Sequence, residues 1–65
     1  MTYICFIESN ILSVPHMEPL GALSAEEARD EARRLLRNHA SGIAAHVFAG
    51  EECVHTIRVD ELEGA

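Results

Sequence analysis

The chain contains no lysine, and its only cationic side chains are five arginines, set against eleven carboxylates for a formal net charge of −6. A surface of that sign repels nucleic acid and anionic membrane and attracts basic protein surfaces. No apolar run approaches the ~20 residues that a membrane-spanning helix needs. The sequence therefore predicts an acidic binding protein with a basic protein as partner, and no direct contact with nucleic acid or membrane.

Motifs typical of catalytic and metal sites are also missing. The four glycines are scattered singly, so there is no glycine-rich phosphate loop. The histidines show no His-x-x-x-His spacing and the cysteines no Cys-x-x-Cys spacing, although His46, Cys53 and His55 could converge on a hairpin under one of its two pairings. We therefore predict no catalytic residue, no enzymatic activity, no cofactor and no metal ion.

The two cysteines, Cys5 and Cys53, each lie in an apolar, strand-like run. This position favours free, buried thiols that act as small hydrophobic side chains. A disulfide between them would require the first and last strands to be neighbours. Residues 1–13 contain neither a basic stretch nor a small-residue cleavage site, so the sequence predicts no signal peptide and a cytoplasmic location.

The first part of the single domain predicts two strands and a loop. Residues 2–7 form an unbroken β-branched and aromatic run, which indicates a strand that is apolar on both faces. We expect a turn at residues 8–10 and a short second strand at residues 11–14. Pro15 would end that strand at an edge of the sheet, and residues 16–22 would form a loop.

A helix is the best-defined element. Ser24 is the predicted N-cap, and Glu27 completes a capping box. Leu23, just before the cap, is expected to pack against Ala28. Gly42 would end the helix after about 16 residues. An apolar stripe at helical spacing would face the sheet: Ala28, Ala32, Leu35 and Leu36.

Two further strands, residues 43–48 and 53–59, flank a hairpin at residues 49–52. A two-residue loop would put one mixed set of side chains on a common face: His46, Phe48, Cys53, His55 and Ile57. A three-residue loop would gather the aliphatic set instead, and we prefer it for that reason: Ile43, Ala45, Val47, Cys53, Ile57 and Val59. The acidic tail from Asp60 onward is expected to be frayed.

Together these elements predict an α+β fold of the type ββαββ, with one helix packed on a four-stranded, mainly antiparallel sheet. Strand order 2-1-3-4 satisfies the antiparallel pairings with a right-handed crossover through the helix. One helix cannot cover both faces of the sheet, so an apolar face is expected to serve a homodimer or another partner. That face would carry Ile4 and Phe6, or else Tyr3, Cys5 and Ile7, joined by Phe48 and Val54 or their alternates.

Charge is distributed unevenly along the chain. In residues 24–40 four arginines balance four acids, with the acids first and the arginines last, as the helix dipole favours. Asp30 and Arg34 are spaced for an ion pair. The rest of the chain carries seven acids against Arg58 alone, which accounts for the whole net charge. The arginines at the helix C-terminus would lie near Asp60 and Glu61.

The predicted topology brings acids from several segments to the opposite end, because the hairpin tip should lie near the helix N-terminus. We predict that these acids form a partner-binding site in which spaced carboxylates imitate the phosphates of nucleic acid. Apart from Arg29, no cation would dilute this site. Its members are Glu18, Glu26, Glu27, Asp30, Glu31, Glu51 and Glu52.

The chain resembles the small acidic inhibitors carried by phages, in particular anti-CRISPR proteins. The resemblance lies in the opening strand MTYICFIES, the capped helix LSAEEARDEARRLL, the closing hairpin GIAAHVFAGEECVHTIRV and the acidic surplus. It implies a small antiparallel sheet with one helix, and an inhibitor that blocks a subunit of a CRISPR surveillance complex at its DNA-binding surface. Some such inhibitors mimic DNA. A phage-encoded inhibitor would act in the host cytoplasm.

A second segment is similar to the strand–loop–helix of HicB-type antitoxins. It consists of VPHMEPLG at residues 14–21, followed by SAEEARDEARRLL. This resemblance implies a toxin as partner. A third alternative is a small bacterial ββαββ domain that acts only as an oligomerisation module. The three alternatives thus differ in the partner: a nucleic-acid-binding protein, a toxin or a second copy of the chain.

Overall fold

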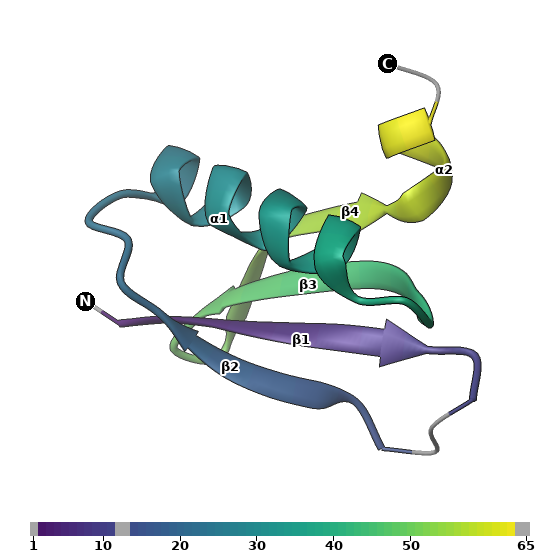
Figure 1. Cartoon of the computed structure of the whole chain (residues 1–65). Coiled ribbons are helices and arrows are strands. Elements are labelled where there is room, and N and C mark those ends of the chain that lie inside the picture. Colours follow the sequence, from purple (N-terminus) through teal and green to yellow (C-terminus); the bar gives the residue numbers. More distant parts are fainter. Residues whose placement is uncertain (1, 12–13, 64–65) are drawn as a thin grey trace.

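The computed structural model describes residues 2–11 and 14–63 as four strands and two helices. The four strands form one antiparallel sheet in the order β2-β1-β3-β4, and α1 packs across one of its faces (Figure 1). The predicted ββαββ fold and strand order are confirmed. The elements are β1 (Tyr3–Ser9), β2 (His16–Leu20), α1 (Ala25–Asn38), β3 (Gly42–Ala49), β4 (Glu52–Arg58) and α2 (Val59–Glu63).

The core lies between α1 and the sheet and is built largely from small side chains. Ala28 and Ala32 are fully buried on the sheet-facing side of α1, which lets the helix approach the strands closely. Leu36 is buried on the same side, and Leu35 packs against the core from its margin. The strands contribute Cys5, Ile7, Leu20, Ala45, Val47 and Ile57.

The N-terminus of α1 forms at the predicted residue. The Ser24 hydroxyl accepts a hydrogen bond from the Glu27 N–H at 3.2 Å, as an N-cap does. The Glu27 carboxylate accepts a hydrogen bond from the Leu23 N–H at 3.4 Å. In a capping box the donor would be the N–H of the N-cap itself, Ser24. The predicted packing of Leu23 on Ala28 is wrong, because Leu23 is 89% exposed.

The C-terminus of α1 comes earlier than predicted. The helix spans 14 residues with His39 as its C-cap, so Gly42 is not its terminator but the first residue of β3. Close packing requires glycine at this position. A Cβ atom on Gly42 would lie 2.9 Å from Leu36 Cδ1 and 3.2 Å from Ile7 Cγ2.

The second strand lies later in the sequence than predicted. β2 occupies most of the expected loop at residues 16–22, and Pro15 precedes it instead of ending it. Of the predicted strand at residues 11–14, Ile11 and Val14 are exposed and belong to no strand, while residues 12 and 13 lie outside the described residues. The predicted turn at residues 8–10 is also wrong in part, because β1 continues to Ser9.

An edge position explains why β2 tolerates a proline. Pro19 pairs with Ile4 of β1, and β2 has no strand on its other side. Backbone N–H groups on the outer edge of a sheet need no ladder partner, so proline is accepted there. Alternation along β2 then buries Leu20 in the core, and this burial stabilises the register.

The β3–β4 hairpin has a two-residue loop, so the preferred three-residue loop is wrong. Ala49 pairs with Glu52 across Gly50 and Glu51. Gly50 has a φ of 64°, and within the described residues no other residue has a positive φ. A positive φ at the first central residue alone is the pattern of a type II′ turn, which favours glycine there.

A bulge in β4 combines features of both predicted pairings. Val54 is an extra residue between the Val47–His55 and Phe48–Cys53 pairs, and it reverses the alternation of side chains. The aliphatic side chains Ala45, Val47 and Ile57 therefore face α1, as preferred. Cys53 does not join them.

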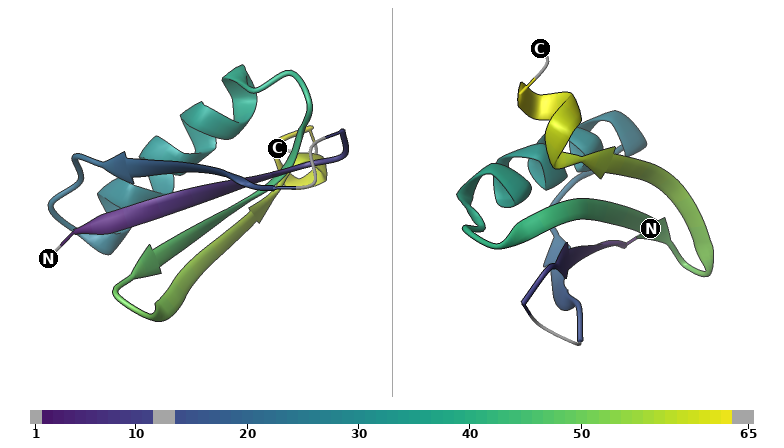
Figure 2. Two further views of the ribbon diagram at one scale, coloured as in Figure 1. Left: turned by 90° about the horizontal axis from the view of Figure 1, so that it is seen from below. Right: turned by 90° about the vertical axis from the view of Figure 1, so that its right-hand side faces the viewer.

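The face of the sheet opposite α1 is the open face, and it carries Ile4, Phe6 and Phe48 of the first predicted set, whereas Val54 packs against the core. Figure 2 shows, from below, the strands lying in front of α1 with no described helix over them. Ile4, Phe6 and Phe48 are half-buried there, and the Phe6 and Phe48 rings meet edge to face at 5.4 Å.

The acidic tail is partly ordered, contrary to the prediction. Residues 59–63 form α2, which packs against α1 and β3 on the same side of the sheet as α1. Val59 and Leu62 contact the core cluster and anchor this short helix. None of the helices in the described part of the chain is long and apolar enough to cross a membrane.

Candidate functional site

Five of the seven carboxylates predicted to bind a partner lie on α1 and the adjacent strand β2. Glu26 and Asp30 are one helical turn apart and both exposed, and Glu27 and Glu31 form a second pair with the same spacing. Glu18 lies on β2. We call these five residues the helix acids. They give the N-terminal half of α1 an anionic surface.

The raised pKa of the Cys5 thiol indicates that Glu18 and Glu31 lie close to each other. Burial, and after it the negative charges of Glu18 and Glu31, raises the pKa of the Cys5 thiol from 9.0 to about 11. Both carboxylates therefore lie near the same buried atom. Glu31 also accepts a hydrogen bond at 3.4 Å from the N–H of Gly21, the residue that follows β2, so the two elements are linked at this point.

Glu51 and Glu52 form a separate group at the hairpin tip, which we call the tip acids. His55 marks where β4 passes the start of α1, because its Nε2 lies 3.1 Å from the Ala25 carbonyl oxygen. Glu52 is three residues farther along the strand, or about 10 Å. The tip therefore lies at the same end of the molecule as the N-terminus of α1 but curves away from it (Figure 1).

Within the described residues, none of these seven acids forms an ion pair with an arginine. Within residues 2–11 and 14–63, the ion pairs are Arg58–Asp60 at 3.9 Å and two histidine–carboxylate contacts, His46–Glu8 at 3.1 Å and His16–Glu18 at 3.6 Å. The predicted Asp30–Arg34 pair is not among them. The helix acids and tip acids thus present their charges mainly to solvent.

The opposite end of α1 is basic and meets α2. Arg37 lies in the last turn of α1 and lines a cleft with Val59 and Leu62 of α2. Asp60 and Glu61 are in the first turn of the same short helix. The acids of α2 therefore lie near the basic half of α1, whereas the N-terminal half of α1 contains Arg29 as its single arginine.

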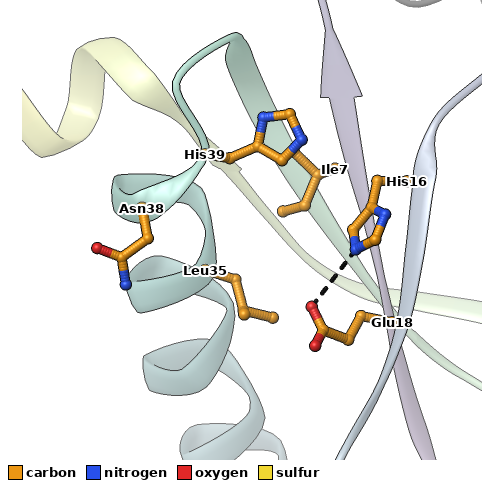
Figure 3. A pocket seen from close by; sticks show the side chains of 6 residues that line it. All are labelled: Ile7, His16, Glu18, Leu35, Asn38 and His39. Carbon is orange, nitrogen blue, oxygen red and sulfur yellow. Dashed lines mark ion pairs between the residues drawn. The ribbon is translucent and has the colours of Figure 1, made fainter.

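A shallow cavity of about 180 Å³ lies beside β2 and the C-terminal turn of α1 (Figure 3). Its walls bring together His16 and Glu18 of β2 with His39, the C-cap of α1, and the two imidazole rings are 6.0 Å apart. Sequence reasoning missed this pairing because it placed His16 in a loop. The cavity is smaller than the ~300–1,000 Å³ of typical ligand sites.

Another histidine, His46, lies at the centre of a series of hydrogen bonds on the open face. His46 Nε2 is 3.1 Å from a Glu8 carboxylate oxygen, and His46 Nδ1 is 3.3 Å from the Thr56 hydroxyl. The Cys53 sulfur lies 3.6 Å from the same hydroxyl. No motif in the sequence signals this series, because its members come from three strands.

The hydrogen-bonded series Glu8–His46–Thr56 places a carboxylate, an imidazole and a hydroxyl in the order found at nucleophilic catalytic sites. A substrate would also need a concave site beside the hydroxyl. The two cavities described above lie at the margins of α1, on the other side of the sheet. Neither of these two cavities is lined by Glu8, His46 or Thr56.

The structure separates the residues whose spacing in the sequence left a metal site or a disulfide open. His55 faces α1, whereas His46 and Cys53 lie on the open face. In the described part of the chain, no three His, Cys, Asp or Glu side chains are grouped so as to hold a metal ion. Cys5 and Cys53 are both free, and β3 lies between their strands. Cys5 is buried as predicted, but the prediction is wrong for Cys53, which is exposed.

No protein-family model, curated protein or solved structure matches this chain. Its function is therefore inferred from its own residues and their placement.

Proposed function

We propose that this chain is a non-enzymatic inhibitor that occupies the basic surface of a nucleic-acid-binding protein, in the manner of the anti-CRISPR-type inhibitors that it resembles. The observation that supports this proposal is the set of helix acids and tip acids without an arginine partner, in a chain of net charge −6. A subunit of a CRISPR surveillance complex would be a partner of this kind. The inhibitor would act in the cytoplasm, in the host if a phage encodes it.

Uncompensated carboxylates favour binding because no internal ion pair has to be broken first. Glu26 and Asp30 repel each other across one helical turn, which costs the free helix a few tenths of a kcal/mol, about 0.2–0.5. A cationic surface would remove this repulsion and release counterions, as happens when nucleic acid binds a protein. Long-range attraction would also raise the association rate at low salt.

The two groups of acids are suited to a concave or elongated basic surface. The helix acids lie along the N-terminal half of α1 and on the adjacent strand β2, and the tip acids lie beyond the start of that helix. A nucleic-acid-binding groove offers cations along a line, since it must follow a phosphate backbone. We propose that the helix acids line such a groove and that the tip acids contact its rim.

The proposal can be tested by capture from a lysate of the source organism, followed by competition with nucleic acid. We expect the immobilised chain to retain a nucleic-acid-binding protein at low salt and to release it as salt rises. The purified partner should lose its DNA or RNA when the chain is added. Capture that is insensitive to salt, or that leaves nucleic-acid binding unchanged, would contradict the proposal.

Matched variants separate the site from net charge alone. Changing Glu26, Glu27, Glu51 and Glu52 to glutamine raises the net charge from −6 by four, to −2. Changing Asp60 and Glu61 to lysine also raises it by four, to −2, at the opposite end of α1. We expect only the first variant to lose the partner. A toxin captured in place of a nucleic-acid-binding regulator would favour the antitoxin alternative.

A further inference from the structure

The open face presents an apolar surface made by three adjacent strands. Directly paired residues point to the same face, so Ile4 of β1 lies between Pro19 of β2 and Phe48 of β3. One row further, Phe6 has Met17 on one side and His46 on the other. Pro19 is exposed and Met17 is 56% exposed, so the patch reaches the edge of the sheet.

The polar groups in this surface already have partners within the chain. A carboxylate can only accept hydrogen bonds, so His46 donates from Nε2 to Glu8. In the neutral imidazole Nδ1 then accepts from the Thr56 hydroxyl, whose oxygen can accept from the Cys53 thiol. Covering the face would therefore leave none of these side chains without a hydrogen-bond partner, which removes the main cost of burying them.

Charge distinguishes this face from the rest of the surface. Glu8 and Arg58 occupy one row of the open face, on either side of Ala44, and their formal charges cancel. The helix acids and the tip acids belong to other surfaces or to the loop beyond the strands, while Asp60 of α2 lies 3.9 Å from Arg58 Nε. Two copies of a chain of net charge −6 can therefore meet here with less repulsion than elsewhere.

We propose that a second copy of this chain covers the open face, related by a twofold axis that runs parallel to the strands between β1 and β3. Under this symmetry β1 lies over the partner subunit's β3, so Ile4 packs on the partner's Phe48. Glu8 then lies next to the partner's Arg58, and the same contact recurs on the other side of the axis. A twofold interface has this self-complementary character.

The Arg58 side chain is available for this contact. Its Nε lies 3.9 Å from Asp60, but both side chains are more than half exposed, so the pair contributes little stability. A guanidinium has five N–H donors, and most of them remain free for a second carboxylate. Glu8 likewise uses one carboxylate oxygen for His46 and keeps the other.

The size of the face predicts a weak dimer. Four strands about 4.8 Å apart and about 20 Å long offer a flat area of roughly 400 Å² per copy. Stable dimers bury about 800 Å² per partner, so this interface belongs with the transient ones. We therefore expect a monomer–dimer equilibrium that shifts with concentration.

Sedimentation equilibrium of the purified chain, from micromolar to millimolar concentration, tests the proposal. The wild type should fit a reversible monomer–dimer equilibrium. Met17→Glu adds a carboxylate to the proposed interface, and should weaken association by about tenfold or more. Leu23→Glu is the matched control, since Leu23 is 89% exposed and lies in the loop before α1. It should leave the equilibrium unchanged apart from the effect of one added charge.

A charge exchange tests the proposed symmetry. Glu8→Arg alone should weaken the dimer by placing two arginines together, and Arg58→Glu alone should weaken it by placing two carboxylates together. The double variant restores the opposite charges and should recover association. Circular dichroism on each variant checks that the fold is kept.

A wild-type chain that stays monomeric at millimolar concentration would overturn the proposal, and so would equal effects of Met17→Glu and Leu23→Glu. Failure of the double variant to recover association while folded would overturn the stated symmetry. The result is independent of the proposed inhibitory function, because none of these substitutions replaces a helix acid or a tip acid.

Discussion

At the scale of single residues, the thiol of Cys5 links the core to the acidic surface. It is fully buried, and both Glu18 and Glu31 act on it. The unfolded chain would ionise this thiol near pH 9.0, whereas the folded chain holds its pKa at about 11. A raised folded-state pKa of a thiol stabilises the fold at low pH, and that contribution is lost as pH rises through this window.

We therefore predict that the free energy of unfolding falls between pH 9 and pH 11, by a limit of ~1.4 kcal/mol per pH unit from Cys5 alone. Denaturant titrations of Cys53→Ser and of Cys5→Ala/Cys53→Ser would measure this contribution as the difference between two pH profiles. The variant without Cys5 should lose the additional slope. Parallel profiles for the two variants would show that Cys5 is not buried as described.

At the same scale, alanine substitutions at two glycines are expected to have opposite effects on stability. Gly42→Ala would place a methyl group 2.9 Å from Leu36 Cδ1, and should destabilise the fold by about 1–3 kcal/mol. Gly21→Ala meets no atom within 4 Å, and should be neutral or stabilising by up to about 1 kcal/mol. Thermal or urea unfolding of both variants would check this. Similar losses for the two would contradict the close approach of α1 to β3.

At the scale of elements, the N-terminus of α1 depends on one hydroxyl. Ser24 Oγ accepts from the Glu27 N–H, so Ser24→Ala should lower the free energy of unfolding by about 1 kcal/mol. Ser24→Asp is the matched control, because its carboxylate can accept the same bond and should keep the stability of the wild type. Urea unfolding would distinguish the two variants. Equal stability of Ser24→Ala and Ser24→Asp would contradict the role of Ser24 as the N-cap.

The helix was predictable, but the second strand was not. Capping residues and the stripe of Ala28, Ala32 and Leu36 are local signals, and local signals determine where a helix starts. β2 has a proline inside it and a glutamate at its centre, so its sequence indicates a loop. Pairing with β1 and burial of Leu20 outweigh that local preference.

The bulge in β4 limited how well the sequence could predict which face of the sheet each side chain occupies. The extra residue Val54 allows a two-residue turn and an aliphatic inner face together, whereas strict alternation offers only one of them. The position of Cys53 depends on this bulge, and so does the hydrogen-bonded chain through Thr56 and His46. Such a chain depends on the register of three strands and has no local motif.

At the scale of the whole molecule, the strand order followed from general rules of connection. Short loops between antiparallel neighbours and a helical crossover leave few arrangements for two hairpins and one helix. The same rules placed the hairpin tip at the N-terminal end of α1 but did not show that it curves away. The seven acids therefore lie in two groups, and the proposed partner would have to reach both.

Uncompensated charge is the central feature of the proposed inhibitor. Apart from Arg29, its arginines lie in the second half of α1 and in β4, and the net charge is −6. The open face has no net charge, and we propose that it joins two copies. The acidic end and the open face would then act independently, one toward a basic partner and the other toward a second subunit.

The most direct test of the central claim is the salt dependence of binding to the captured partner. The affinity of the wild type should fall by at least tenfold between about 50 and 200 mM salt. It should be weaker and less salt-dependent for the variant with Glu26, Glu27, Glu51 and Glu52 changed to glutamine. The variant with Asp60 and Glu61 changed to lysine should behave as the wild type. An affinity that is flat with salt, or equal losses in the two variants, would contradict the proposed site.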